Sequence, residues 1–356
     1  GSEMCIRDRV STLLTWERVR SFNVGFDFGA FSNRLTGSFD YFVRKTVDMV
    51  GPAPQLPLVL GIAPAIVNNA DMKSYGFEIE LSWRDRIGEV DYGVKFNLAD
   101  AQQKVVKYPN TTNAFSDWYA GKMSGEIWGY TSLGIAKTDE EMKEHLASLP
   151  NGGQNQLGNK WGAGDIMYAD INGDGKVDGG KGTLADPGDQ RIIGNSTPRY
   201  NFGLVLDASY KGFDVSIFFQ GVGKRDYAPI VGTNGAVFWG AVNNIWQSMA
   251  MEEHFDYFRP EGHPMGANLN GYYPRPDFTS NKNHQVQTRY LQDASYIRLK
   301  NLQIGYTLPK QWINKLQINR CRVYVSGDNL WTGTSLASMF DPETLAAGDW
   351  GSGKTY

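Results

Sequence analysis

Hydrophobic residues recur at every second position over several long stretches of this chain. In residues 22–30, and again in 35–43, apolar side chains alternate with Asn, Gly, Asp, Ser and Thr, and Ser32-Asn33 lies between the two stretches. A period of two places apolar side chains on one face of a β-strand and polar side chains on the other. Two such stretches joined by a short polar link predict a long β-hairpin.

Three further hairpins are predicted in the same way. The first pairs residues 75–83 with 92–98 around a turn at 87–89, and the second pairs 200–210 with 213–219 around Lys211-Gly212. The third pairs 294–307 with 320–331, and its apolar register shifts near Lys300-Asn301, which predicts a β-bulge. A short helix is predicted between these hairpins, from Thr138 as N-cap, with Glu141 three residues on, to about Leu149.

The lengths of the strands and of their connections favour one β architecture. The predicted strands have about 10–14 residues, against about 5–6 in soluble proteins and about 9–11 for a tilted strand that crosses a membrane. Short links at 31–34, 85–90, 210–212 and 308–319 alternate with long ones at 47–73, 105–197, 224–293 and 332–356. This alternation is typical of outer-membrane β-barrels, as is Tyr at both ends of an apolar row (Tyr200, Tyr210). A soluble β-sandwich with long strands remains an alternative.

Composition excludes several classes of protein. The 35 Lys+Arg and 38 Asp+Glu give a net charge of −3, which provides no electrostatic footprint for nucleic acid. The mean hydropathy is −0.41, and no run approaches the roughly 20 apolar residues of a membrane-spanning helix. Cys5 and Cys321 are too few for a disulfide framework. Residues 1–9 share no pattern with the rest and are interpreted as a non-native tail, so the fold is assigned to residues 10–356.

One segment resembles the first half of an EF-hand calcium loop. Oxygen-bearing side chains stand at loop positions 1, 3, 5 and 9, a Gly stands at position 6, and a main-chain carbonyl is available at position 7. Position 12 is Lys181, where an EF-hand has Glu, so Asp186 or Asp189 would have to supply the last ligand. The alternative is a turn with solvated carboxylates. The candidate ligands of a structural Ca²⁺ are Asp170, Asn172, Asp174, Lys176 and Asp178.

Aromatic residues in the long loops suggest a second kind of site. Flat rings stack on sugar faces, although rings in loops also pack loops against one another. The candidate substrate-binding residues are Trp118, Tyr119, Trp128, Trp239, Trp246, Tyr272 and Tyr273. Nucleophile-elbow, zinc-protease and P-loop motifs are absent from the sequence. Glu78 and Glu80 lie on one strand face about 7 Å apart, which resembles a catalytic carboxylate pair but also fits charges that line a barrel lumen. No catalytic residue and no organic cofactor are therefore assigned.

Several motifs together resemble one family. They occur in order along about residues 12–350, and they are Trp16-Glu17, residues 23–29 (NVGFDFG), residues 34–42 (RLTGSFDYF), residues 68–72 (NNADM), residues 75–81 (YGFEIEL), Gly164-Asp165-Ile166, residues 194–200 (GNSTPRY), Gly212-Phe213-Asp214, residues 218–221 (FFQG), residues 294–301 (ASYIRLKN) and residues 326–330 (SGDNL). With these motifs the chain resembles the SusC/RagA family of TonB-dependent outer-membrane transporters of Bacteroidota.

The resemblance implies an all-β fold, in which about eight antiparallel strands form the C-terminal portion of a roughly 22-stranded transmembrane β-barrel with long extracellular loops. It also implies import of oligosaccharides or peptides across the outer membrane, a SusD-like surface lipoprotein over the loops, and TonB, ExbB and ExbD acting through an N-terminal part. The plug, the TonB box and the last strand are expected outside this chain, so the fragment alone is expected to be inactive. The alternatives are a soluble β-rich glycan-binding module with a structural calcium site and a glycoside hydrolase.

Overall fold

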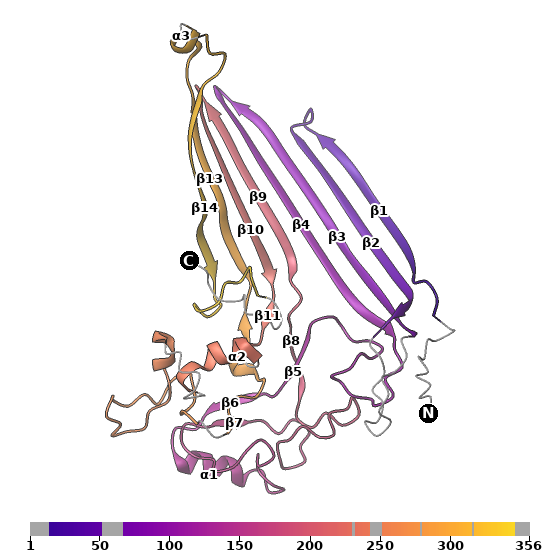
Figure 1. Cartoon of the computed structure of the whole chain (residues 1–356), viewed down its shortest axis with the longest axis vertical. Helices are drawn as coiled ribbons and strands as arrows, with labels where there is room; N and C mark the ends of the chain where they lie inside the picture. Colours follow the sequence, from indigo (N-terminus) through magenta and orange to yellow (C-terminus); the bar gives the residue numbers. More distant parts are fainter. Residues whose placement is uncertain are drawn as a thin grey trace, which may run out of the picture.

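The computed structural model describes residues 14–51, 67–229, 232–242, 251–277, 280–314 and 317–345. Eight long strands form one antiparallel sheet in the order β1-β2-β3-β4-β9-β10-β13-β14, which is the order of the chain (Figure 1). The sheet strands are β1 (Arg18–Ala30), β2 (Leu35–Val50), β3 (Asn68–Ile87), β4 (Val90–Lys107), β9 (Arg199–Tyr210), β10 (Phe213–Lys224), β13 (Tyr296–Thr307) and β14 (Arg322–Thr334). The expected antiparallel meander is confirmed, with β1 and β14 as its two outer strands.

All four predicted hairpins are present. Short turns close β1–β2, β3–β4 and β9–β10, and the predicted bulge appears as a register shift between Leu299 and Asn301 against β14. The strands β2, β3 and β4 have 16, 20 and 18 residues, more than the sequence pattern indicated. They are longer because they continue to pair beyond the alternating apolar segments, where polar and charged residues replace the apolar ones.

The two faces of the sheet differ in chemistry. One face carries the apolar rows, and these side chains remain uncovered: Phe22 is 61% exposed, Phe26 60% and Val325 76%. A soluble sandwich would bury such a face against a second sheet. In the described residues the apolar face has no covering layer, which does not fit the alternative of a soluble β-rich module. No helix among these residues is both long and apolar enough to span a membrane.

Short elements gather at one end of the sheet (Figure 1). They belong to the connections after β4, β10 and β14, whose described residues within 108–198, 225–295 and 335–345 we call the loop domain. Its elements are β5 (Glu126–Gly129), β6 (Ser132–Ile135), α1 (Asp139–Ala147), β7 (Ile166–Tyr168), β8 (Arg191–Asn195), β11 (Asp226–Tyr227), α2 (Gly232–Trp239), η2 (Gly240–Val242), η4 (Glu252–Phe255), η5 (Thr288–Tyr290) and β12 (Gln292–Asp293). One further helix, α3 (Lys310–Ile313), lies in the β13–β14 turn at the opposite end.

Helix α1 begins where the sequence predicts. The Thr138 hydroxyl accepts a hydrogen bond from the Glu141 amide at 3.1 Å, and three acidic residues occupy the first turn, where the helix dipole favours negative charge. The Glu141 carboxylate accepts a hydrogen bond from the Lys137 amide at 2.6 Å, one residue before the N-cap. The short strands and the other helices of the loop domain have no counterpart in the sequence prediction.

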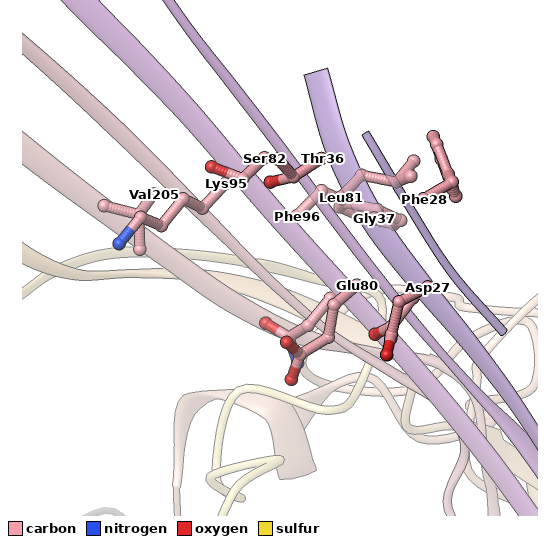
Figure 2. A pocket seen from close by; sticks show the side chains of 12 residues that line it. Asp27, Phe28, Thr36, Gly37, Glu80, Leu81, Ser82, Lys95, Phe96 and Val205 are labelled. Atoms are coloured by element: carbon pink, nitrogen blue, oxygen red, sulfur yellow. The ribbon is translucent and has the colours of Figure 1, made fainter. Parts of the chain in front are cut away.

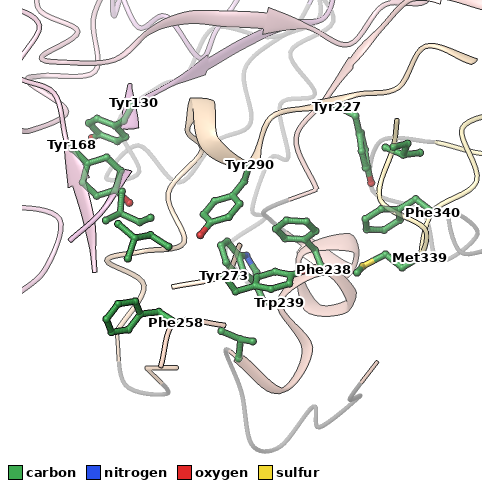
Figure 3. Packing of buried hydrophobic residues seen from close by; sticks show 14 of the residues in the cluster. Tyr130, Tyr168, Tyr227, Phe238, Trp239, Phe258, Tyr273, Tyr290, Met339 and Phe340 are labelled. Carbon is green, nitrogen blue, oxygen red and sulfur yellow. The ribbon is translucent and has the colours of Figure 1, made fainter. Parts of the chain in front are cut away.

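The loop domain has its own hydrophobic core. Buried residues of all three connections share one cluster, including Tyr130 and Tyr168 from the first, Tyr290 from the second and Phe340 from the third (Figure 3). Tyr130 meets Tyr168 edge to face with ring centroids 5.7 Å apart. The long connections are therefore a packed unit at one end of the sheet. Residues 1–9 and Trp246, for which the sequence made predictions, lie outside the described residues.

Candidate functional site

The polar face of the sheet contains a groove of about 530 Å³. Its polar walls come from β1, β2, β3 and β4, and Figure 2 shows the carboxylates of Asp27 and Glu80 directed into it. These two residues are linked through the ladder, because Asp27 stands opposite Ser38 and Ser38 stands opposite Glu80. Glu80 in turn stands opposite Asn97 on β4. One cross-strand row of polar side chains therefore lines the groove.

Negative charge dominates this part of the polar face. Asp27, Asp40, Glu78 and Glu80 are all exposed, and Asp40 stands directly opposite Glu78. The cation that lines the groove is Lys95 on β4, which stands opposite Ser82. Like charges placed opposite each other destabilise a ladder, so this arrangement is not explained by sheet stability. It gives this part of the polar face an acidic, solvent-exposed surface.

A glycine makes room for one of these carboxylates. Gly25 stands opposite Asp40, and a Cβ at position 25 would lie 2.2 Å from an Asp40 carboxylate oxygen and 2.8 Å from the Phe39 carbonyl. The backbone oxygen leaves little freedom to relax, so a side chain at position 25 would displace the Asp40 carboxylate. The acidic surface thus depends on a small residue of the neighbouring strand.

The calcium-like loop is ordered by its own backbone. Asp170 accepts hydrogen bonds from the amides of Gly173 and Gly175 at 2.7 and 2.8 Å, and Gly173 and Gly175 have positive φ angles of 76° and 81°. Asn172 accepts a hydrogen bond from the Asp174 amide, and Asp174 accepts one from the Lys176 amide. The side-chain oxygens at positions 1, 3 and 5 thus contact loop amides, which is the arrangement of successive Asx turns.

The remaining candidate ligands are also engaged within the protein. The Lys176 ammonium lies 2.5 Å from an Asp178 oxygen and holds the pKa of that carboxyl below its usual range. Asp189 is fully buried and accepts hydrogen bonds from the amides of Ile171, Asn172 and Asp178, while burial raises its pKa. Across the described residues, no three Asp, Glu, His or Cys side chains converge on one point. The donors have the right chemistry for calcium, but in this conformation they do not form a ligand set.

The candidate aromatic residues fall into two groups. Trp239 and Tyr273 are each 1% exposed and belong to the hydrophobic core of the loop domain (Figure 3). The ring centroids of Trp239 and Tyr290 are 4.9 Å apart. These two rings pack the loops and offer no face to a ligand, so the structure assigns them to packing instead of sugar stacking. Trp118, Tyr119, Trp128 and Tyr272 are only partly buried.

The partly buried rings also have neighbours within the loop domain. Trp118 meets Tyr108 edge to face, with ring centroids 6.0 Å apart. Trp128 stacks on Phe115, with ring centroids 4.5 Å apart. The Tyr119 hydroxyl donates a hydrogen bond to Glu126, and burial raises the pKa of this phenol. Substrate binding by these four residues stays a prediction.

A buried ion cluster, centred on Asp165, was not predicted. Asp165 is fully buried and accepts hydrogen bonds from Lys282 at 2.9 Å, from Arg275 at 2.6 and 2.9 Å, from Asn283 at 3.0 Å and from the Gly162 amide at 2.9 Å. The Lys282 side chain is 1% exposed. The cluster joins two segments of the loop domain that lie more than 100 residues apart. In the sequence, Asp165 stood out only as part of the motif Gly164-Asp165-Ile166. The motif did not indicate that Asp165 would be buried or form ion pairs.

Two cations of β13 attach the loop domain to the sheet. Arg298 on β13 is 7% exposed and pairs with Asp341 at 2.6 Å and with Glu343, while Lys300 reaches the same glutamate at 2.8 Å. Within the loop domain, Arg225 joins the three connections, because it donates hydrogen bonds to the carbonyls of Ser196 and Leu345 at 3.1 and 2.5 Å. The segment 335–345 is thereby held over the end of the sheet from which the loop domain projects.

Long strands with one apolar and one polar face, short turns at one end and a packed loop domain at the other define a wall segment of an outer-membrane type of β-barrel. The chain belongs to the family of TonB-dependent receptor β-barrels, because the family model described as "TonB dependent receptor-like, beta-barrel" matches residues 9–330. This confirms the family expected from the sequence motifs. The proteins of this family are outer-membrane receptors, which gives no support to the glycoside hydrolase alternative.

Curated relatives agree with this assignment. The chain is 29% identical over 356 residues to TonB-dependent receptor P3 of Formosa agariphila, covering 95% of this chain and 32% of that protein. It is 21% identical over 314 residues to TonB-dependent receptor SusC of Bacteroides thetaiotaomicron, covering 84% of this chain and 27% of that protein. The chain thus spans about a third of the length of these relatives.

Solved structures show the same fold. The RagAB peptide transporter matches with a TM-score of 0.66 and 23% sequence identity, covering 93% of this chain and 33% of that one. The RagAB peptide importer in its open-open state matches with a TM-score of 0.60 and the same identity. At this level of identity the likeness concerns the arrangement of the strands and not the cargo.

Proposed function

We propose that the receptor containing this chain imports oligosaccharide or peptide fragments across the outer membrane, driven by TonB with ExbB and ExbD. The observation that carries the proposal is that one eight-stranded sheet has an exposed apolar face and, on the opposite face of β1–β4, an acidic groove. The apolar face suits lipid, and the polar face suits a hydrated passage. The segment described here forms part of the wall of that passage.

The loop domain provides a surface on which a partner protein could lie. It packs as one unit and is tied to the sheet through Arg298 and Lys300, so it offers a firm surface at the end that we place outside the cell. A SusD-like surface lipoprotein would rest on this surface and cover the entrance. The names of the RagAB structures, a peptide transporter and importer, favour peptides, whereas the partly exposed loop aromatics favour oligosaccharides.

Uptake assays with the full-length receptor test this function. Deleting the receptor gene should abolish accumulation of a labelled oligosaccharide or of a labelled peptide mixture, and the complete gene should restore it. A complementing gene with a disrupted TonB box should not restore it. If uptake of both cargo classes is unchanged by the deletion, the proposed import function is wrong.

We propose in addition that residues 170–178 bind a structural Ca²⁺ through Asp170, Asn172, Asp174, the Lys176 carbonyl and Asp178. Binding requires that the Lys176 ammonium leaves Asp178 and that the carboxylates turn from the loop amides. Millimolar Ca²⁺, but not equal Mg²⁺, is expected to raise the melting temperature of the full-length receptor and to protect this loop from protease. Asp174→Ala should remove the effect, whereas Glu140→Gln on the exposed side of α1 should retain it. A melting temperature that is unaffected by Ca²⁺ in the wild type would contradict calcium binding.

A further inference from the structure

Four cations form one row across four neighbouring strands. Arg20 on β1 stands opposite Lys45 on β2, Lys45 stands opposite Lys73 on β3, and Lys73 stands opposite Lys104 on β4. Adjacent strands are about 4.8 Å apart, so the four positions span about 14 Å across the sheet. We call these four residues the basic row.

The basic row lies on the apolar face. Side chains two residues apart share a strand face, and the next row toward the short turns is Phe22, Val43, Tyr75 and Gln102. Further apolar rows follow along β1 as far as Ala30. The eight residue-to-residue steps from 22 to 30 span about 27 Å along the strand, or about 21 Å after a typical barrel tilt, close to the roughly 25 Å apolar band of outer-membrane barrels. The basic row therefore marks the border of this band on the side of the loop domain.

Among the described residues, few acidic groups compensate the charge of the basic row. Lys45 lies 3.6 Å from Asp71, and the Lys73 ammonium lies over the Tyr75 ring at 5.3 Å. Arg20 and Lys104 are exposed, and no carboxylate of the described residues forms an ion pair with either. The other acidic groups at this rim are engaged elsewhere, since Asp48 pairs with Arg18 and Glu17 accepts a hydrogen bond from the Val50 amide at 3.0 Å. One carboxylate thus serves four cations placed opposite one another, an arrangement that costs stability unless an anion joins it.

The opposite end of the same strands is different. At the short turns, Arg34 pairs with Asp85 at 3.1 Å, Lys211 pairs with Glu89 at 2.8 Å, and Arg86 lies 3.8 Å from Asp91. Each of these cations has an acidic partner in the protein. The turn ends of β1–β4 therefore lack the excess of positive charge that the same four strands show at the end that carries the loop domain.

We propose that the basic row binds the phosphate group of a lipid in the outer leaflet of the outer membrane. Arg and Lys donate charge-assisted hydrogen bonds to phosphate oxygens, and basic residues near an anionic membrane surface are attracted to it. The acyl chains of that lipid would lie along the apolar rows that begin at Phe22 and Tyr75. Free phosphate shares the first interaction but not the second. The inference rests on the membrane placement proposed above and goes beyond the import function.

Binding of lipid A to the purified full-length receptor tests the proposal without any cargo. Native mass spectrometry should detect tighter binding of phosphorylated lipid A than of chemically dephosphorylated lipid A to the wild type. The triple variant Arg20→Gln, Lys73→Gln, Lys104→Gln should bind lipid A at least tenfold more weakly. The matched control Arg34→Gln, Arg86→Gln, Lys211→Gln also removes three cations, at the turn end, and should stay within twofold of the wild type.

Each other outcome overturns the proposal. Equal binding of the two lipid A forms by the wild type would do so even if a variant failed to fold. Equal losses in both triple variants would indicate a nonspecific charge effect, and unchanged binding in the basic-row variant would remove its role. Inorganic phosphate that competes at the same concentration as lipid A would indicate a simple anion site. Failure of the import function would instead appear in the uptake assay, where lipid A binding is not measured.

Discussion

Replacing Asp165 with alanine should destabilise the loop domain by about 3–5 kcal/mol. The fully buried carboxylate accepts hydrogen bonds from Lys282 and Arg275, and its removal leaves the nearly inaccessible Lys282 ammonium without its closest carboxylate. Asp277, at 3.7 Å, is too distant to replace it fully. In the full-length receptor we expect rapid proteolysis within residues 150–170 and 270–290 and an earlier thermal transition of the loop domain.

The matched control is the exposed ion pair of Lys211 and Glu89 at the turn end. Glu89→Ala removes a carboxylate from an ion pair whose side chains are about 60% exposed, and such exposed pairs add little to stability because solvent screens them. Protease sensitivity of the loop domain in this variant should equal that of the wild type. If Asp165→Ala is as resistant to protease as Glu89→Ala, the cluster does not hold the loop domain together.

Trp239→Ala should cost about 3–5 kcal/mol through loss of burial and creation of a cavity. The ring is 1% exposed and contacts Phe238, Tyr273 and Tyr290 at centroid distances of 5.1, 5.9 and 4.9 Å. We expect weaker packing of the whole loop domain and, as a consequence, loss of uptake for every cargo. Thermal unfolding and uptake of two unrelated cargos measure these effects together.

Trp118→Ala provides the comparison for this aromatic substitution. Trp118 is only partly buried and contacts Tyr108 edge to face, so its removal should change stability by about 1 kcal/mol, as is typical of one aromatic pair. A cargo-selective loss of uptake in this variant would support sugar stacking. A cargo-selective loss in Trp239→Ala with unchanged stability would contradict the packing role of Trp239.

The strands could be predicted from the sequence because their signal is local. Alternation with a period of two fixes which side chains share a face, and two alternating stretches around Lys211-Gly212 fix the register of a hairpin. The bulge near Lys300 was visible for the same reason, since an extra residue shifts the apolar pattern. The basic row could not be recognised from any single hairpin, because its four residues come together only when the register of four strands is known.

The loop domain could not be predicted because its contacts are not local. Trp118 and Trp239 look alike as loop tryptophans, and only the meeting of distant segments makes one partly exposed and the other buried. The same holds for Asp165, whose partner Asn283 lies 118 residues away. In the calcium-like loop the spacing gave the positions of the oxygens but not their directions, which the loop amides determine.

The core shared by the three connections has a consequence for the order of folding. Tyr130 belongs to the first connection and Leu345 to the last, so the cluster is complete only when nearly the whole described chain is in place. Contacts of such large sequence separation form slowly, since a long loop must close before any apolar surface is buried. The hairpins can pair one after another, but the loop domain must wait for the segment after β14. During that interval its aromatic residues stay uncovered, which makes the incompletely folded chain prone to aggregation.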